Sequence, residues 1–478
     1  MMSKHKRILE HILVFILATL PLLLSSRLLW LKSPPVWSDE AVFTDIAKHI
    51  GTVGRPTTEL YGKLIPGLSH GQVAYPPVYF YVLHVWMSLF GQSIDAVRLL
   101  SLFTGIGVLG LWYLLLAKLT KQNLWAGLGT LLLASEPRFQ AASRIARMDI
   151  LVLFFILLSI LAYWSANHRK LFVFISGFIA ALTVLTHPMG FLAPALLLSV
   201  IWCQKTGNKV KLQQFMLILL PLALGAGLWL STQIPTWRIF VDQLVLQSAR
   251  KAVLPAYLWI YIRQSPANIF LYLFYLLIVL TGLLGGLGKR DTFPVQLSIF
   301  TVFVVVTLIL TKEQWYLIYL TPLFIVNVIL SSRYIVLNSK FWKPVGILFI
   351  VIPLIFYTKS FVDTYNDTAR DNYIQFSRRV LSALPSQGTI CLSSLPDPYF
   401  TLDSDKKLQL REFVYAPTLL PEKFNFLRDC NAVVMNISPG ETTIQYLLQH
   451  EISRNVIGDA DSYNALVVIL SPKGNKTP

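Results

Sequence analysis

The sequence predicts a polytopic α-helical membrane protein of about eleven spans, with a small α/β domain at its C-terminus. Of its 478 residues 55% are hydrophobic and only 14% are charged, and the mean hydropathy of +0.59 excludes an ordinary soluble domain. Long apolar runs recur as far as about Tyr357, and the sequence beyond is polar with mixed charges. We therefore expect a membrane domain over residues 1–358 and a soluble domain over residues 359–478.

The first apolar run, Ile8 to Leu31, has about 24 residues and can cross a ~30 Å hydrocarbon core at ~1.5 Å per residue. It is too long for a signal-peptide core and no small-residue cleavage site follows it, so we expect a retained span. The later apolar runs cover residues 76–90, 96–117, 123–137, 149–165, 170–187, 189–203, 212–231, 266–287, 293–311, 314–330 and 343–358.

The run 76–90 is the exception among them, because about 15 residues make a helix of only ~22 Å. It opens with Tyr75-Pro76-Pro77 and is rich in aromatic residues, which is typical of a helix at the headgroup interface. With this run at the interface eleven spans remain, and every inner loop is basic. The inner cations are Lys4, Lys6, Arg7, Lys118, Lys121, Arg169, Lys170, Lys205, Lys209, Lys211, Lys289, Arg290, Arg333, Lys340 and Lys343.

This charge pattern predicts a multi-pass protein of the plasma (inner) membrane, with the first outer loop, residues 32–95, and the C-terminal domain on the extracytoplasmic side. The net charge of +17 follows from the basic inner loops, so nucleic acid is not an expected partner. Cys203, Cys391 and Cys430 have no metal-ligand spacing. If the C-terminal domain is exported, Cys391 and Cys430 can form a disulfide, but we favour two buried free thiols.

The first outer loop contains Trp37-Ser38-Asp39-Glu40, which is the most informative segment of the chain. Its two adjacent carboxylates follow the first span directly, where they can lie in water and still face a substrate embedded in lipid. Ser38 is predicted to cap a helix that runs through Asp39 to His49.

The second outer loop brings Arg138, Arg144, Arg147 and Asp149 together at the start of a span. Outer loops are usually poor in arginine, and guanidinium groups match phosphate oxygens, so Arg144 and Arg147 are candidates for binding an anionic ligand. An internal Arg–Asp pair or a headgroup contact is an equal alternative for these two arginines, and is the interpretation we favour for Arg138.

Other outer loops add weaker candidates. A second phosphate ligand is expected from Arg250 or Lys251, and the spacing does not separate them. Lys312 is another outer cation, with Tyr316 one helical turn later. His187 lies beside Pro188 at an outer turn. A single histidine at such a turn is more often structural than catalytic.

Taken in order, these segments resemble the GT-C glycosyltransferases of the protein O-mannosyltransferase and aminoarabinose (lipid A) transferase superfamily. The resemblance covers most of the membrane domain. It lies in Asp39-Glu40 after the first span, Tyr75-Pro76-Pro77 before an amphipathic helix, Val97-Arg98-Leu99, Ala146-Arg147-Met148-Asp149, and the pattern Lys312, Tyr316, Pro322.

The resemblance implies a GT-C fold and transfer of a hexosyl or pentosyl group from a polyprenyl-phosphate donor to an acceptor on the outer face. It also implies that Asp39 is the general base, Arg98 a phosphate or active-site ligand, and Asp149 the second acidic position. The aminoarabinose enzymes have an acidic and a basic residue before the double proline, where this chain has Ala74 and Tyr75. Without a large soluble insertion, the chain resembles a smaller bacterial-type member whose acceptor (lipid, glycan or protein) stays open.

The expected chemistry needs a base for the acceptor hydroxyl, cations for the departing phosphate and an apolar groove for the prenyl chain. A one-step displacement inverts the anomeric centre and needs only one carboxylate, so Glu40 is expected to orient Asp39, pair with an arginine or face solvent. The sequence identifies no cofactor. A divalent metal between Asp39 and Asp149 stays open, without a His/Cys set to support it, and no glycine-rich loop indicates a nucleotide sugar. The predicted site has catalytic Asp39, Glu40 and Asp149, donor-phosphate ligands Arg98, Arg144, Arg147, Arg250, Lys251, Lys312 and Tyr316, and pocket residues Tyr75 and His187.

In the C-terminal domain, a 3.6-residue period predicts a helix over residues 365–384. Strands are expected at 389–393, 432–436 and 465–470 and a further helix at 443–451, and we favour a supporting role for the domain. Two alternatives to an enzyme stay open. They are a lipid-phosphate transporter or flippase, and a non-catalytic subunit of envelope assembly. The lack of an internal repeat argues against a transporter.

Overall fold

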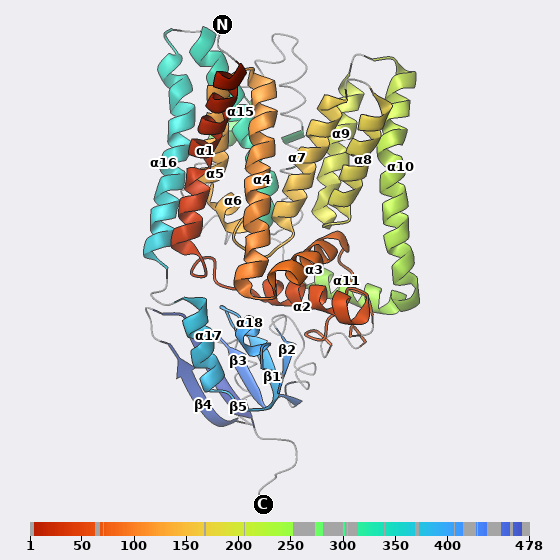
Figure 1. Ribbon diagram of the computed structural model, residues 1–478, viewed down its shortest axis with the longest axis vertical. Coiled ribbons are helices and arrows are strands. Elements are labelled where there is room, and N and C mark those ends of the chain that lie inside the picture. The colour runs from red at the N-terminus through yellow and green to blue at the C-terminus, as the bar shows by residue number, and fades with distance from the viewer. Residues whose placement is uncertain are drawn as a thin grey trace, which may run out of the picture.

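The computed structural model describes residues 4–62, 67–69, 71–166, 169–204, 206–251, 273–280, 300–301, 304, 314–338, 340–368, 372–405, 407–413, 427, 429–436, 451–458 and 462–470. A bundle of long helices stands above a small sheet, and the N-terminus lies at the end of the bundle far from the sheet (Figure 1). The bundle contains α1 (Lys4–Leu29), α4 (Ile94–Thr120), α5 (Asn123–Ser135), α7 (Asp149–Ser165), α8 (Lys170–Val184), α9 (Leu192–Cys203), α10 (Asn208–Gln233), α15 (Thr321–Asn338) and α16 (Lys343–Asn366).

The bundle has the character expected of a multi-pass membrane protein. Within the described residues, five helical segments are long and apolar enough to cross a membrane, and shorter apolar helices such as α7 and α8 pack among them. Large apolar side chains cover the outer surfaces of α1 and α10, as lipid-facing surfaces require. The predicted runs 266–287 and 293–311 lie mostly outside the described residues, so the count of eleven spans stays a prediction.

Short helices lie across the end of the bundle that faces the sheet. They include α2 (Ser38–Val53), α3 (Val78–Phe90) and α11 (Trp237–Lys251), and Figure 1 shows them between the long helices and the sheet. The position of α3 agrees with the interfacial helix predicted for residues 76–90. Short connecting elements complete this end: α6 (Pro137–Ala142), η1 (Pro188–Phe191), η2 (Ile234–Thr236) and η3 (Gln314–Tyr319).

The C-terminal domain combines helices with a mixed sheet. Its described strands are β1 (Gly388–Ser393), β2 (Leu408–Glu412), β3 (Ala432–Met435), β4 (Glu451–Ile457) and β5 (Ala465–Leu470), in the order β2-β1-β3-β5-β4. The strands β2, β1 and β3 are parallel, and β5 pairs antiparallel with β3 and β4. The prediction found β1, β3 and β5 and missed β2 and β4, which are the edges of the sheet and carry more polar residues.

The helix predicted over residues 365–384 is wrong in its extent. The span α16 continues to Asn366, and a separate helix, α17 (Tyr373–Ser382), begins after Asn372. Asn372 caps α17, since its Oδ1 accepts a hydrogen bond from the backbone N–H of Gln375 at 3.1 Å. A short α18 (Tyr399–Leu402) follows β1. The helix predicted at 443–451 lies outside the described residues, except that Glu451 begins β4.

The preference for free thiols at Cys391 and Cys430 is also wrong, because the two form a disulfide. Cys391 lies in β1, and Cys430 precedes β3, which pairs with β1 in parallel. This pairing brings their Cα atoms to 5.9 Å although they stand 39 residues apart in the sequence. Cysteine spacing alone contains no strand order, which is why the sequence left the bond undecided.

We expect the double substitution Cys391→Ala/Cys430→Ala to reduce the stability of the C-terminal domain by about 2–4 kcal/mol, because the bond closes a long loop in the unfolded chain. Thermal unfolding of the purified protein measures this, and alkylation with mass analysis verifies the bond. Cys203→Ala is the control. Equal alkylation of all three cysteines before reduction would contradict the assignment.

Candidate functional site

The two adjacent carboxylates of the first outer loop point in different directions. Successive residues of a helix are ~100° apart, so one turn of α2 directs Glu40 into the protein and Asp39 toward its edge. Glu40 is fully buried, whereas the side chain of Asp39 is 19% exposed. The two neighbours therefore have different roles.

Glu40 is a structural anchor. Its Oε1 accepts hydrogen bonds from Arg98 Nε at 2.9 Å and from the backbone N–H of Ala146 at 2.8 Å, and its Oε2 accepts from Arg98 Nη2 at 2.7 Å. Oε2 also accepts from the backbone N–H of Trp37 at 3.1 Å. Ser38 is thus the first residue of α2 and not its cap as predicted. Trp37 occupies the cap position, and Glu40 satisfies its N–H.

Asp39 belongs to a second charged array. Arg147 lies between two carboxylates, since its Nη1 pairs with Asp39 and its Nε donates to Asp149 Oδ2 at 3.1 Å. The guanidinium also lies 5.4 Å from the centre of the Trp315 ring. Burial lowers the pKa of Arg147, but the Asp39 and Asp149 carboxylates outweigh burial and raise this pKa above its usual value.

Two tyrosines of η3 continue this array. Tyr319 donates its hydroxyl hydrogen to Asp149 Oδ1 at 3.1 Å. Tyr316 lies 3.3 Å from His187 Nε2. Because His187 Nδ1 accepts the backbone N–H of Met189 at 3.1 Å, we infer that the neutral ring carries its proton on Nε2 and donates it to Tyr316. His187 thus caps the N-terminus of η1 and also faces the array.

Arg144 is the remaining cation of this region. Its side chain is buried, and its Nε donates to the backbone carbonyl of Ser33 at 3.2 Å. Within the described part of the chain, Nη1 of Arg144 and Nη1 of Arg98 have no hydrogen-bond partner. Burial and the nearby charge of Arg98 lower the pKa of Arg144 to about 9, so the group stays charged at neutral pH.

The structure brings only some of the predicted site residues together. Asp39, Arg147, Asp149, Tyr316 and His187 form one connected array, with Glu40, Arg98 and Arg144 behind it. Tyr75 packs with Phe43 and Phe80 in an aromatic cluster between α2 and α3. Arg138 pairs with Glu136 at 3.5 Å, so its internal partner is a glutamate and not the aspartate of the expected Arg–Asp pair. Lys312 and the side chains of Arg250 and Lys251 lie outside the described residues.

Three contributors to the array were not predicted from the sequence: Trp37, Trp315 and Tyr319. The rings of Trp37 and Trp315 meet edge to face at 5.4 Å and close one side of it. Tyr319 follows Tyr316 by three residues, and the spacing Tyr316-x-x-Tyr319 is the signal that was available.

Known structures share this architecture. ArnT from Cupriavidus metallidurans in the apo state matches with a TM-score of 0.55 and 14% identity, over 96% of this chain and 97% of that one. ArnT bound to undecaprenyl phosphate matches with a TM-score of 0.54 and 13% identity, over 98% of both chains. The Archaeoglobus fulgidus oligosaccharyltransferase tethered to an acceptor peptide matches with a TM-score of 0.53 and 13% identity, over 95% of this chain and 74% of that one.

The chain thus has the fold of the GT-C membrane glycosyltransferases, and the predicted resemblance is confirmed at this level. Residues 65–233 also match the family of dolichyl-phosphate-mannose-protein mannosyltransferases, a segment that contains Arg98, Arg147, Asp149 and His187. A comparison with curated protein sequences gave no significant match.

Because Glu40 neutralises Arg98 where neither side chain meets solvent, we expect Glu40→Ala to reduce stability by about 3–5 kcal/mol. Thermal unfolding in detergent measures the change. Glu10→Ala removes an exposed carboxylate from α1 and is expected to change stability by less than ~0.5 kcal/mol. Equal behaviour of the two variants would show that Glu40 does not anchor the site.

Proposed function

We propose that this protein is a membrane glycosyltransferase that moves a sugar from a polyprenyl-phosphate donor to an acceptor on the extracytoplasmic face, with Asp39 as general base. The observation that carries the proposal is the array Asp39–Arg147–Asp149, in which a partly exposed carboxylate adjoins a guanidinium at the end of the helix bundle. The fold shared with an ArnT that binds undecaprenyl phosphate supports a lipid-linked donor. The acceptor stays open among lipid, glycan and protein hydroxyls.

The reaction is a single displacement. Asp39 takes the proton of the acceptor hydroxyl, whose oxygen forms a bond to the anomeric carbon of the sugar. The bond from that carbon to the phosphate oxygen breaks, and the polyprenyl phosphate departs with the electron pair. The anomeric centre is inverted, and the proton remains on Asp39 until solvent removes it.

Arg147 links base and leaving group in this proposal. In the structure it pairs with Asp39, and a donor phosphate placed beside it offers a second anionic partner, which carries one charge as a diester and gains a second as it departs. Movement of the guanidinium toward the phosphate would release Asp39 to act as base and stabilise the charge of the leaving group. Asp149 and Trp315 keep the guanidinium within reach of both positions.

Arg98 and Arg144, which lie behind the array, are assigned different roles. Arg98 has committed Nε and Nη2 to Glu40, so we assign it to holding α2 in place. Arg144 contacts no carboxylate in the described part of the chain and keeps an unpaired N–H, so we retain it as a candidate phosphate ligand.

A divalent metal fits the described residues poorly. Arg147 already pairs with Asp39 and Asp149, which are the two carboxylates that would have to bind the ion. Among the described residues, three His, Cys, Asp or Glu side chains do not gather in a metal-binding arrangement. We therefore derive no step through a metal.

An apolar cavity adjoins the array through Tyr319, and we assign to it a short part of the prenyl chain. It has a volume of about 110 Å³ and lies between α4, α7, α9 and α15, with Trp112, Leu157, Leu197 and Leu323 in its wall. Tyr319 also lines the cavity while its hydroxyl group binds Asp149. One side chain thus separates an apolar space from the charged site, which is the arrangement that a lipid with a phosphate head requires.

We expect Asp39→Asn to keep the fold and donor binding and to reduce sugar transfer at least ~100-fold, the order of effect typical of a general base. Transfer from radiolabelled polyprenyl-phosphate sugar to an envelope acceptor fraction measures it. Asp363→Asn, an exposed carboxylate near the end of α16, is the matched control. Unchanged transfer by the Asp39 variant would reject the assignment, and lipid movement across vesicles without transfer would favour a flippase.

We expect Leu157→Trp to fill part of the cavity and to raise KM for long-chain donors at least several-fold, while donors with a short prenyl chain are affected little. Kinetics with donors of two chain lengths measure this. Leu228→Trp, at an exposed apolar position of α10, is the control for the added bulk. An equal effect on both donors would place the prenyl chain elsewhere.

A further inference from the structure

The C-terminal domain is joined to the first outer loop by main-chain hydrogen bonds on both sides of α2. The N–H of Asp397 donates to the carbonyl of Val36 at 2.9 Å, just before the helix begins, and the N–H of Glu412 donates to the carbonyl of Leu60 at 2.9 Å, after it ends. The domain therefore contacts the segments that determine where α2, and with it Asp39, lies.

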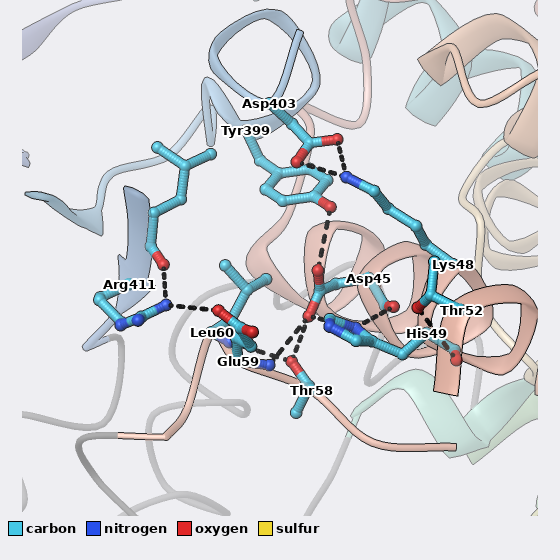
Figure 2. Close-up of polar contacts among 11 residues, drawn as sticks. Asp45, Lys48, His49, Thr52, Thr58, Glu59, Leu60, Tyr399, Asp403 and Arg411 are labelled. Atoms are coloured by element: carbon cyan, nitrogen blue, oxygen red, sulfur yellow. Dashed lines mark hydrogen bonds and ion pairs between the residues drawn. The ribbon is translucent and has the colours of Figure 1, made fainter. Parts of the chain in front are cut away.

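Side chains reinforce this seam between α2 and the domain (Figure 2). Lys48 of α2 pairs with Asp403 at 2.9 Å, and Arg411 of β2 pairs with Glu59 at 3.5 Å. The buried Asp45 accepts the hydroxyl groups of Thr58 at 2.5 Å and Tyr399 at 3.5 Å, as Figure 2 shows.

Two carboxyl groups of the C-terminal domain lie buried behind these contacts. Asp397 follows β1 and Glu412 ends β2, and they are 0% and 1% exposed. Their side chains are within hydrogen-bond reach of each other. Asp397 Oδ1 accepts the N–H of Tyr399 at 2.9 Å, but Asp397 Oδ2 and both carboxyl oxygens of Glu412 have no donor among the described residues. Within the same residues no cation pairs with either group.

We propose that Asp397 and Glu412 share a proton and that this protonated pair locks the C-terminal domain onto the first outer loop, which makes them positioning residues for Asp39. Two facing carboxylates cannot both be ionised in a buried site, and a shared proton supplies the hydrogen bond that their oxygens otherwise lack. Loss of the proton leaves two like charges directly behind the main-chain bonds to Val36 and Leu60. The proposed docking of the C-terminal domain does not depend on the activity of the protein. The positioning of Asp39 as a base rests on the proposed function.

The surrounding charges favour the protonated pair. Asp39, Glu40 and Asp45 of α2 face it with negative charge, while Arg147 pairs with Asp39, Arg98 with Glu40 and His49 with Asp45. Among the described residues, Tyr373 of α17 and Tyr399 of α18 are further titratable groups beside it. Burial raises the pKa of Asp397 from 3.8 to about 6. Burial and the Asp397 carboxylate raise the pKa of Glu412 well above its usual range.

The direction of the pH effect follows from these shifts. A carboxyl whose pKa is raised by folding contributes stability that is present at low pH and lost as the pH rises. Asp397 and Glu412 titrate as a pair, in which the first proton leaves near pH 6 and the shared proton leaves only at higher pH. Docking is therefore expected to be lost when the pH rises far enough to remove the shared proton.

His49 requires a control because it titrates in the same direction. Its hydrogen bond to Asp45 raises its pKa, so its contribution is present below its usual value of 6.5 and lost as the pH rises through the higher folded-state value. His49→Gln removes this contribution and leaves Asp397 and Glu412 unchanged.

The test compares the full-length protein with Glu412→Gln and Asp397→Asn at pH 5 and pH 8.5. Each amide keeps the shape of the carboxyl and donates a hydrogen bond that no longer depends on a proton. Hydrogen exchange of the peptides that contain the backbone N–H groups of residues 397 and 412, which donate the two docking bonds, is read relative to an unfolded peptide standard of the same sequence at the same pH. We expect the wild type to lose at least tenfold in protection at pH 8.5 and each amide variant to keep it.

Asp403→Asn and His49→Gln are expected to retain the pH-dependent loss of protection, because neither alters the pair. The same loss in both amide variants as in the wild type would overturn the proposal, and so would pH-independent protection of the wild type. Sugar transfer is measured in parallel, with the amide variants expected to retain a larger share of their rate at pH 8.5. Absence of transfer in every variant would count against the proposed function, while the exchange data would still decide the lock.

Discussion

The buried ion pair between Glu40 and Arg98 is the interaction on which the rest of the site depends. Both side chains are inaccessible to solvent, and neither can lose its partner without leaving an uncompensated charge in the protein. Through the backbone bonds of Glu40 to Trp37 and Ala146, the pair joins the start of α2, the long helix α4 and the loop before α7. It thereby determines which way Asp39, the next residue on the same helical turn, must point.

Asp39 is therefore held from two sides. The ion pair of Glu40 fixes α2 to the helix bundle, and the main-chain bonds from Asp397 and Glu412 fix the ends of the same segment to the C-terminal domain. Among the described residues, Arg147 is the side chain that pairs with the Asp39 carboxylate, which is partly exposed. The backbone around Asp39 is thus held rigidly, while the Arg147 side chain that pairs with it can move. This suits a carboxylate that must exchange a proton beside a charged ligand.

Much of the architecture was predictable because it follows from local patterns. The lengths of the apolar runs predicted the long helices, the short aromatic run 76–90 predicted an interfacial helix where α3 lies, and strands were predicted at the positions of β1, β3 and β5. The edge strands β2 and β4 were missed because half-exposed strands are less apolar. The break between α16 and α17 was missed because periodicity continues across it, while the cap at Asn372 interrupts the helix.

The sequence by itself determined a membrane helix bundle, a polar C-terminal domain and a set of charged residues at one end of the spans, because length, hydropathy and charge act locally. Only the tertiary structure decided that Glu40 is an anchor and Asp39 a partly exposed neighbour, that Arg147 lies between two carboxylates, and that Cys391 joins Cys430. It also brought Tyr319 to Asp149 and Asp397 to Glu412. These pairs join segments separated by up to hundreds of residues, and which charge meets which depends on how helices and strands pack, which spacing along the chain does not contain.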